Sequence, residues 1–209
     1  MNKPITPLRD QLIDSATDLF MRLGIKSVSM DDLAREMGVS KKTIYQEVGN
    51  KEALVELVMK CDTENDLRRI RQHEHEAHDA IDEFLRNSRY FIREMRDINP
   101  TTMRDLQKYY PGVWRATMEK HQDINNEIVA RNIQRGMEEG LYRDDLDAEV
   151  IANFYVGLVS VMIDAVVFPA RDRPLSEIIR HHSMYHLNGI VNQFGRERMD
   201  QYLRTETLD

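Results

Sequence analysis

A six-residue segment of the chain concentrates side chains that bind phosphates and base edges. These side chains belong to Lys41, Lys42, Thr43, Tyr45 and Gln46. Ammonium and hydroxyl groups hydrogen-bond to phosphate oxygens, and an amide side chain can pair with adenine in the major groove. The segment therefore indicates contact with a nucleic acid, provided that one helix presents these side chains together.

Two short capped helices joined by a glycine turn are expected to position the segment. Ser29 and Asp32 have the spacing of a capping box, so a helix begins directly after Ser29. Gly38 can adopt the left-handed conformation that ends such a helix, and Ser40 is a good N-cap for the next one. Since so short a connection cannot place the helices antiparallel, the spacing predicts a helix-turn-helix over residues 29–48.

The second helix of a helix-turn-helix enters the major groove with its N-terminus first. That geometry turns the side chains listed above toward DNA, while Ile44 and Val48 point back into the protein core. The alternative interpretation is an ordinary helical hairpin whose two lysines form a solvated face. The sequence on either side of the motif favours DNA binding.

The flanking motifs resemble the N-terminal domain of the TetR family of transcription regulators. The matching pieces are Ala16, Leu19-Phe20, Gly24, Ser29-Met30-Asp31-Asp32-Leu33-Ala34, Gly38-Val39-Ser40, Thr43-Ile44-Tyr45 and Lys51-Glu52-Ala53-Leu54. The resemblance covers residues 8–58. It implies an all-α fold of about nine helices, with a three-helix DNA-binding domain in residues 1–50 and a helical effector-binding and dimerisation domain in residues 51–209.

The resemblance also implies roles for individual residues. Tyr45 and Lys51 would touch the phosphate backbone, and Ser29 and Thr43 would help to anchor the duplex. The lysines at positions 41 and 42 would lie at the edge of the groove. Gln46 is a candidate reader of adenine.

The end of the recognition helix departs from the family pattern. Glu47 and Val48 stand where family members usually carry His or Tyr followed by Phe. A carboxylate repels a phosphate, so Glu47 either turns toward solvent or accepts a hydrogen bond from a cytosine amino group. Val48 replaces an aromatic core residue with a smaller aliphatic one. The segment thus predicts DNA binding without identifying the DNA sequence.

Helical periodicity continues after the DNA-binding helices, with no strand signal and no flexible linker. Six further helices are expected: residues 50–75, 79–96, a short helix holding residues 103–109, and residues 113–139, 148–167 and 175–203. With the three N-terminal helices they make nine.

An effector pocket is also implied by the resemblance. Aromatic and methionine side chains are dense between residues 84 and 118, and such a lining suits a hydrophobic small molecule. The candidates are Phe84, Phe91, Met95, Met103, Tyr110, Trp114 and Met118. The alternative is that these side chains only fill the core.

The segment of residues 148–168 is apolar on too many sides to have a single neighbouring helix. In the family the last two long helices pair with their copies, and a two-fold DNA site suits a dimer. We expect a homodimer through residues 148–168 and 175–195, with an interface that contains Ile151, Tyr155, Leu158, Met162, Leu187 and Val191. A membrane span is disfavoured because Asp164 interrupts the apolar run.

The net charge of −7 is unusual for a DNA-binding protein, but it is unevenly distributed. Residues 1–51 hold eight Lys or Arg and seven Asp or Glu, which leaves 21 basic and 29 acidic residues for the remainder. The recognition helix can therefore be positive on an acidic protein. Cys61 is the only cysteine and the N-terminus has no apolar leader, so a reducing cytoplasm is the expected location.

These observations predict a sequence-specific transcription regulator, a repressor that a small-molecule effector releases from double-stranded operator DNA. None of the seven histidines follows a Glu by three positions, and zinc, phosphate-loop and nucleophile-elbow motifs are missing. No enzyme activity, cofactor or metal is therefore expected. Two alternatives remain: a metal-binding bundle, since His182 and His186 share a helical face, and a helical scaffold that has lost DNA binding through Glu47 and Val48.

Overall fold

The structure, a computed structural model, describes residues 7–96, 98–99, 101–164, 166–169, 172–206 and 208. Within these ranges it contains ten helices: α1 (Pro7–Leu23), α2 (Met30–Glu36), α3 (Lys41–Val48), α4 (Lys51–Glu76), α5 (Ala80–Arg96), α6 (Thr101–Tyr109), α7 (Pro111–Glu138), α8 (Ala148–Met162), α9 (Leu175–Ile190) and α10 (Gln193–Thr205). The expected all-α fold is confirmed. Residues 1–6, on which the expectation about a leader partly rests, lie outside the described residues.

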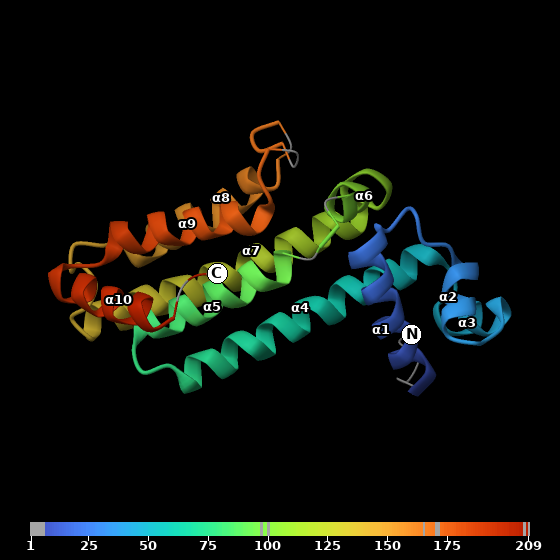
Figure 1. Cartoon of the computed structure of the whole chain (residues 1–209), viewed down its shortest axis with the longest axis horizontal. Helices are drawn as coiled ribbons and strands as arrows, with labels where there is room; N and C mark the ends of the chain where they lie inside the picture. The colour runs from blue at the N-terminus through green and yellow to red at the C-terminus, as the bar shows by residue number, and fades with distance from the viewer. Residues whose placement is uncertain are drawn as a thin grey trace. The chain divides into compact units, whose positions relative to one another are not determined.

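The chain divides into two compact units, whose helices are labelled in Figure 1. Unit 1 contains residues 1–67 and 97–119, and unit 2 contains residues 68–96 and 120–209. Helices α4 and α7 contribute residues to both units. This division differs from the boundary expected at residue 50, because unit 1 also takes in α6 and the N-terminal turns of α4 and α7.

Unit 1 is built around the apolar stripe of α1. Leu12, Ala16 and Phe20 recur at helical spacing and are almost completely buried. Helices α2, α3 and α6 contact this helix, and Leu106 of α6 belongs to the same core. Val48 is buried at the end of α3, so the smaller aliphatic residue does take a core position there.

Unit 2 is centred on α5, which packs against α9 and α10, while α8 packs against α9. The buried residues of α5 include Ile81, Leu85 and Ile92, and they meet Leu187 of α9 and Ile133 of α7 in one core. Burying each large side chain of this kind contributes about 1.5 to 3 kcal/mol. This core, rather than the polar faces of the helices, holds the unit together.

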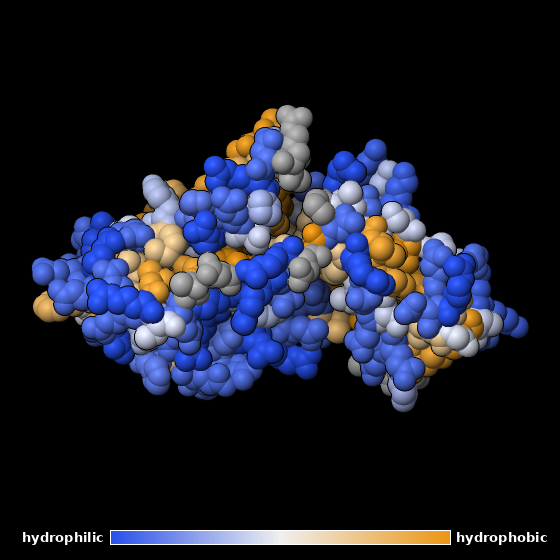
Figure 2. Space-filling view, in the orientation of Figure 1, coloured by the Kyte–Doolittle hydropathy of each residue, from blue (hydrophilic) through white to orange (hydrophobic). Residues whose placement is uncertain are grey.

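The helix expected to extend to residue 167 ends earlier, at Met162. Asp164 then forms a turn, since its side-chain oxygen accepts from the amide of Val166 at 2.8 Å and its backbone oxygen accepts from Phe168 at 2.8 Å. Val166 is 89% exposed, and apolar side chains reach the surface in this region, at the top of Figure 2. Among the described residues, no helix has both the length and the apolar character needed to cross a membrane.

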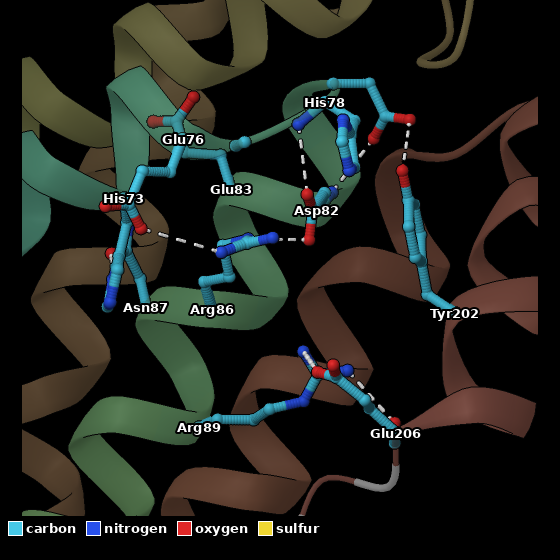
Figure 3. A network of polar contacts seen from close by, with 12 residues as sticks. His73, Glu76, His78, Asp82, Glu83, Arg86, Asn87, Arg89, Tyr202 and Glu206 are labelled. Atoms are coloured by element: carbon cyan, nitrogen blue, oxygen red, sulfur yellow. Dashed lines mark hydrogen bonds and ion pairs between the residues drawn. The ribbon is translucent and has the colours of Figure 1, made fainter.

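Ion pairs and hydrogen bonds join α5 to α10 within unit 2 (Figure 3). Asp79, directly before α5, accepts hydrogen bonds from Arg198 and Tyr202 at 2.8 Å each. Burial by itself raises the pKa of this carboxyl, but the hydrogen bonds from Arg198, the amide of Asp82 and Tyr202 outweigh it and lower the pKa. Farther along, Arg89 and Glu206 lie 2.7 Å apart. These contacts hold α10 against α5.

The single helix expected over residues 175–203 is wrong, because the chain breaks between α9 and α10. Val191 is extended and bridges to Tyr142, and the amide of Asn192 donates to the backbone oxygen of Leu141 at 3.1 Å. Asn192 also caps α10 by accepting from the amide of Gly195 at 2.9 Å. A long-range backbone contact thus overrides the helical periodicity.

Gly195 tests this junction, because a Cβ atom there would collide with the backbone oxygen of Leu141. We expect Gly195→Ala to lower the free energy of unfolding by about 1 to 3 kcal/mol. Each kcal/mol corresponds to roughly 2 to 4 °C in the melting temperature of a domain of this size. Gly112→Ala is the control, since no heavy atom lies within 4 Å of the added group. Equal melting temperatures for the two variants would contradict the close approach.

Candidate nucleic-acid interface

The first helix of the predicted motif is capped as expected. The amide of Asp32 donates to the hydroxyl of Ser29 at 3.2 Å, and the amide of Ser29 donates to the Asp32 carboxylate at 2.9 Å, which confirms the capping box. Hydrogen bonds from Ser29 lower the pKa of the Asp32 carboxyl. Gly38 has φ +65°, and the amide of Val39 donates to Ala34 at 3.0 Å, so the glycine turn is confirmed as well.

Helix α3 is held at both ends by polar caps. The hydroxyl of Ser40 accepts from the amide of Thr43 at 3.1 Å, and Gly49 ends the helix with φ +76°. Asn50 then caps α4 by accepting from the amide of Ala53 at 2.8 Å. These caps fix the start, the end and therefore the rotation of the recognition helix.

The exposed side of α3 carries most of the side chains predicted to face DNA. Exposed residues are Lys41, Lys42, Tyr45 and Gln46, whereas Thr43 and Glu47 are half-buried. The Lys41 ammonium lies 2.7 Å from Asp31 of α2, and this hydrogen bond raises the pKa of Lys41. Exposed ion pairs are weak, so a phosphate can take the place of the Asp31 carboxylate.

Lys51 lies differently from the other predicted phosphate ligands. Its ammonium donates to the backbone oxygen of Ile25 at 2.6 Å and lies 5.8 Å from the centre of the Phe20 ring. Burial lowers the pKa of Lys51, and the nearby carboxylates of Asp105 and Asp32 partly oppose this. Lys51 therefore holds the loop between α1 and α2, and its contact with phosphate stays a prediction.

Helix α6 binds the same loop from another side. The amide of Lys26 donates to the carboxylate of Asp105 at 2.8 Å. Gly24 has φ +84°, and a Cβ atom there would lie 2.5 Å from the hydroxyl oxygen of Thr101. We call the contacts of Lys51, Asp105 and Thr101 with residues 24–26 the loop clamp. Only a glycine allows both the left-handed backbone and this approach of α6.

The C-terminal end of α1 is also tied to α6. The hydroxyl of Thr102 donates to the backbone oxygen of Phe20 at 2.9 Å, and the amide of Asn99 donates to Met21 at 2.7 Å. The sequence reasoning missed Asn99, Thr102 and Asp105. An Asn two residues before Thr101 is a helix-start signal, but no local pattern reveals that this helix binds α1.

The predicted effector-pocket residues divide between the two units. Phe84, Phe91 and Met95 lie on α5 in unit 2, and Phe84 is buried in the core of that unit. The other four, at positions 103, 110, 114 and 118, belong to unit 1, where Tyr110 and Trp114 pack against the core. An effector pocket lined by these seven residues stays a prediction from the sequence.

The predicted dimer-interface residues differ in how exposed they are, and the interface stays a prediction. Leu187 is completely buried and Val191 is 7% exposed, since both lie in the core of their own unit. Met162 is buried, and Tyr155 packs inward against Phe84 with ring centroids 5.7 Å apart. Ile151 is half-buried, and Leu158 is exposed. Because these helices are apolar on several sides, the sequence did not reveal which side faces the core.

A family model matches the N-terminal part of the chain, and one regulator is similar to most of its length. Residues 12–58 match the family described as "Bacterial regulatory proteins, tetR family". The chain is 22% identical over 184 residues to the HTH-type transcriptional regulator YfiR of Bacillus subtilis, covering 84% of this chain and 88% of that protein. The chain is also 22% identical over 129 residues to IcaR of Staphylococcus aureus, which is named as a negative transcriptional regulator of the biofilm operon icaADBC. This similarity covers 49% of this chain and 69% of IcaR.

A solved structure shares the fold. A regulator from Saccharomonospora viridis, solved in complex with choline, has a TM-score of 0.68 and 21% identity to this chain. The similarity covers 89% of this chain and 98% of that protein. At this level of identity the similarity shows that the two chains share a fold.

The structural role of Lys51 can be measured without DNA. We expect Lys51→Met to lower the free energy of unfolding by about 1 to 2 kcal/mol, because the carbonyl of Ile25 loses a charged hydrogen-bond donor. Lys60→Met is the matched control, since Lys60 sits exposed on the same helix with only a 4.0 Å contact to Glu64. Thermal unfolding followed by circular dichroism gives both values. A Lys51 variant as stable as the control would show that the hydrogen bond does not hold the loop.

Proposed function

Because the chain belongs to the TetR family of helix-turn-helix transcription regulators, we propose that it is a repressor that a small molecule releases from operator DNA. The observation that carries the proposal is the capped pair of α2 and α3, which leaves Lys42, Tyr45 and Gln46 exposed on the second helix. IcaR, a negative regulator, supports repression, and the choline complex supports a small-molecule effector.

The DNA contacts proposed for α3 separate into two groups. Lys41, Lys42 and Tyr45 bind phosphates or the groove edge, and they supply affinity that depends on salt. Gln46 is the proposed base reader, because an amide can pair with adenine in the major groove. Ser29, Thr43 and Lys51 at the helix ends complete the proposed backbone contacts, with Lys51 also engaged with Ile25 in the free protein.

The repressor is proposed to act as a homodimer, since two recognition helices are needed to read a two-fold site. Apolar side chains stand exposed on one side of α8 and on α9: Val150, Phe154, Leu158, Val161 and Tyr185. We call these five residues the dimer face. Phe154 is 66% exposed and Tyr185 is 79% exposed, which is costly in water unless a second copy covers them.

The proposed release mechanism passes through α4 and α6. Helix α4 runs from Lys51 in unit 1 to Glu76 in unit 2, and α6 is hydrogen-bonded to α1 and to the loop clamp. An effector that favours another position of α4 and α6 would change the distance between the two α3 helices of the dimer. Both helices could then no longer reach successive grooves. A coupling of about 1 to 3 kcal/mol is typical of such linkage and changes operator occupancy severalfold or more.

Salt-dependent DNA binding tests the proposal directly. In a dimer, Lys42→Ala removes two phosphate contacts, so the slope of log K against log salt should shrink by roughly 1.8. Fluorescence anisotropy with the DNA upstream of the gene for this chain, at several salt concentrations, measures the slope. Lys60→Ala, on the exposed surface of α4, should leave it unchanged. The absence of any salt-dependent binding by the wild type would favour the scaffold alternative.

Sedimentation velocity at micromolar concentration tests the dimer. Phe154→Glu and Leu158→Glu each place a charge in the proposed interface, and each should shift the protein from dimer to monomer. Phe194→Glu is the matched control, because Phe194 is 71% exposed on α10, whereas the dimer face consists of residues of α8 and α9. A monomeric wild type, or dissociation by the control alone, would rule out this interface.

A further inference from the structure

Two imidazoles in unit 2 belong to a cluster of aromatic rings. Phe84 of α5, Tyr155 of α8, and His182 and His186 of α9 form this ring cluster. Tyr155 lies 4.2 Å from His182 and 4.4 Å from His186, measured between ring centroids. Phe84 stacks on His186 at 5.3 Å. Three helices therefore converge on the two histidines.

Each of these histidines carries an unsatisfied buried nitrogen. The Nε2 atoms of His182 and His186 are inaccessible to solvent and have no hydrogen-bond partner in the part of the chain that the structure describes. His186 as a whole is only 9% exposed. Buried polar atoms are nearly always paired, because leaving one unpaired costs free energy. A phenylalanine at either position would fill space without this cost, so the two nitrogens indicate a role in binding a hydrogen-bonding group.

The surroundings keep both imidazoles neutral. Burial lowers the pKa of His182 to about 4, partly offset by a hydrogen bond with the backbone of Tyr155. Burial also lowers the pKa of His186 to about 4, and repulsion from a protonated His182 adds to this. Neither pKa is raised by a carboxylate of the described residues.

The three helices that form the ring cluster carry several charged or titratable side chains. On α5 they are Asp82, Glu83, Arg86, Arg89, Arg93, Glu94 and Arg96; on α8, Glu149; and on α9, Glu177, Arg180 and His181. The two buried carboxylates of α5 are already paired, Asp82 with Arg86 and Glu83 with Arg135. Within the described parts of α5, α8 and α9, no buried carboxylate is therefore left unpaired to stabilise a cation at the ring cluster.

We propose that the ring cluster binds the carboxyl group of an apolar organic acid, with the Nε2 atoms of His182 and His186 as its hydrogen-bond partners. The side chains of Phe84 and Tyr155 offer apolar surface to the hydrocarbon part of the ligand. This inference rests on the proposed function, because it names the chemical class of the effector.

Proton balance makes the proposal specific. The free acid is ionised at neutral pH and both imidazoles are neutral, so binding takes up one proton from solvent. That proton bonds to Nε2 of one histidine and is donated to a carboxylate oxygen. The bound pair is neutral overall, which avoids burying a lone charge. The affinity must therefore fall as the pH rises.

Other ligand classes fit the ring cluster less well. A quaternary ammonium ion would be buried without a compensating carboxylate, and because both imidazoles are already neutral its binding would take up no proton. A zinc ion usually needs three protein ligands or more. No group of three or more His, Cys, Asp or Glu side chains suited to a metal occurs within the described ranges.

Calorimetric titration of the full chain without DNA tests the site, using 1-naphthoate and decanoate as an aromatic and a linear apolar carboxylate. We expect at least one to bind, with an affinity that falls at least tenfold between about pH 5.5 and 7.5. Titrations in buffers of different ionisation enthalpy should show net proton uptake. The corresponding amides should show no such pH dependence. Failure of both carboxylates to bind, or binding independent of pH, overturns the proposal.

Variants on α9 locate the site. His182→Asn and His186→Asn should each weaken carboxylate binding at least tenfold, and the pH dependence should be lost in the variant that lacks the protonated imidazole. His181→Asn is the matched control, because its imidazole is exposed one residue away on the same helix. An equal loss in the control overturns the assignment. If the buried variants do not fold, nitrogen NMR of the wild-type imidazoles serves instead, and no protonation of Nε2 on adding ligand overturns it.

Preference of the wild type for choline or zinc over both carboxylates in the same titrations would also overturn the proposal. Operator release is measured separately, by adding the bound carboxylate to the protein–DNA complex. Carboxylate binding without DNA binding would contradict the proposed function and leave the site intact. DNA binding without any carboxylate binding would contradict only the site.

Discussion

The hydrogen bond from Lys51 to the backbone oxygen of Ile25 is the contact on which the DNA-binding helices depend. It joins the first residue of α4 to the loop between α1 and α2, and Asp105 of α6 binds the next residue of that loop, Lys26. A half-buried loop must find partners for its backbone groups, and here two other helices supply them. The position of α2, and through its turn that of α3, follows from these few polar contacts and from the core beneath them.

At the proposed DNA surface, phosphates would compete with partners that the lysines already have in the free protein. Lys41 is paired with Asp31 across the turn, and Lys51 is engaged with a carbonyl, so two of the proposed phosphate ligands already have partners in the free protein. The exposed ion pair of Lys41 with Asp31 is weak, so a phosphate can replace the carboxylate. Lys51 is half-buried, and this burial lowers its pKa. We therefore expect the affinity for DNA to depend more on Lys42 and on the shape of the capped helices than on the number of cations.

Helix α8 links the two proposals made for unit 2. Consecutive side chains on an α-helix are rotated by about 100°, so Tyr155 joins the ring cluster while Phe154 is exposed on the dimer face. A ligand at the imidazoles would therefore contact the helix that is proposed to pair with its copy. This arrangement offers a short physical route from effector to dimer geometry, in addition to the route through α4 and α6.

The sequence by itself determined the local features of this protein. The capping box at Ser29, the turn at Gly38 and the all-helical fold follow from short-range rules, and the structure has all three. Only the tertiary structure decided features that depend on distant residues. It broke the last helix at Val191 through the bridge to Tyr142, and it turned Leu187 into the core instead of the dimer face. Periodicity marks a helix as apolar, but which side is buried depends on the neighbours that fold against it.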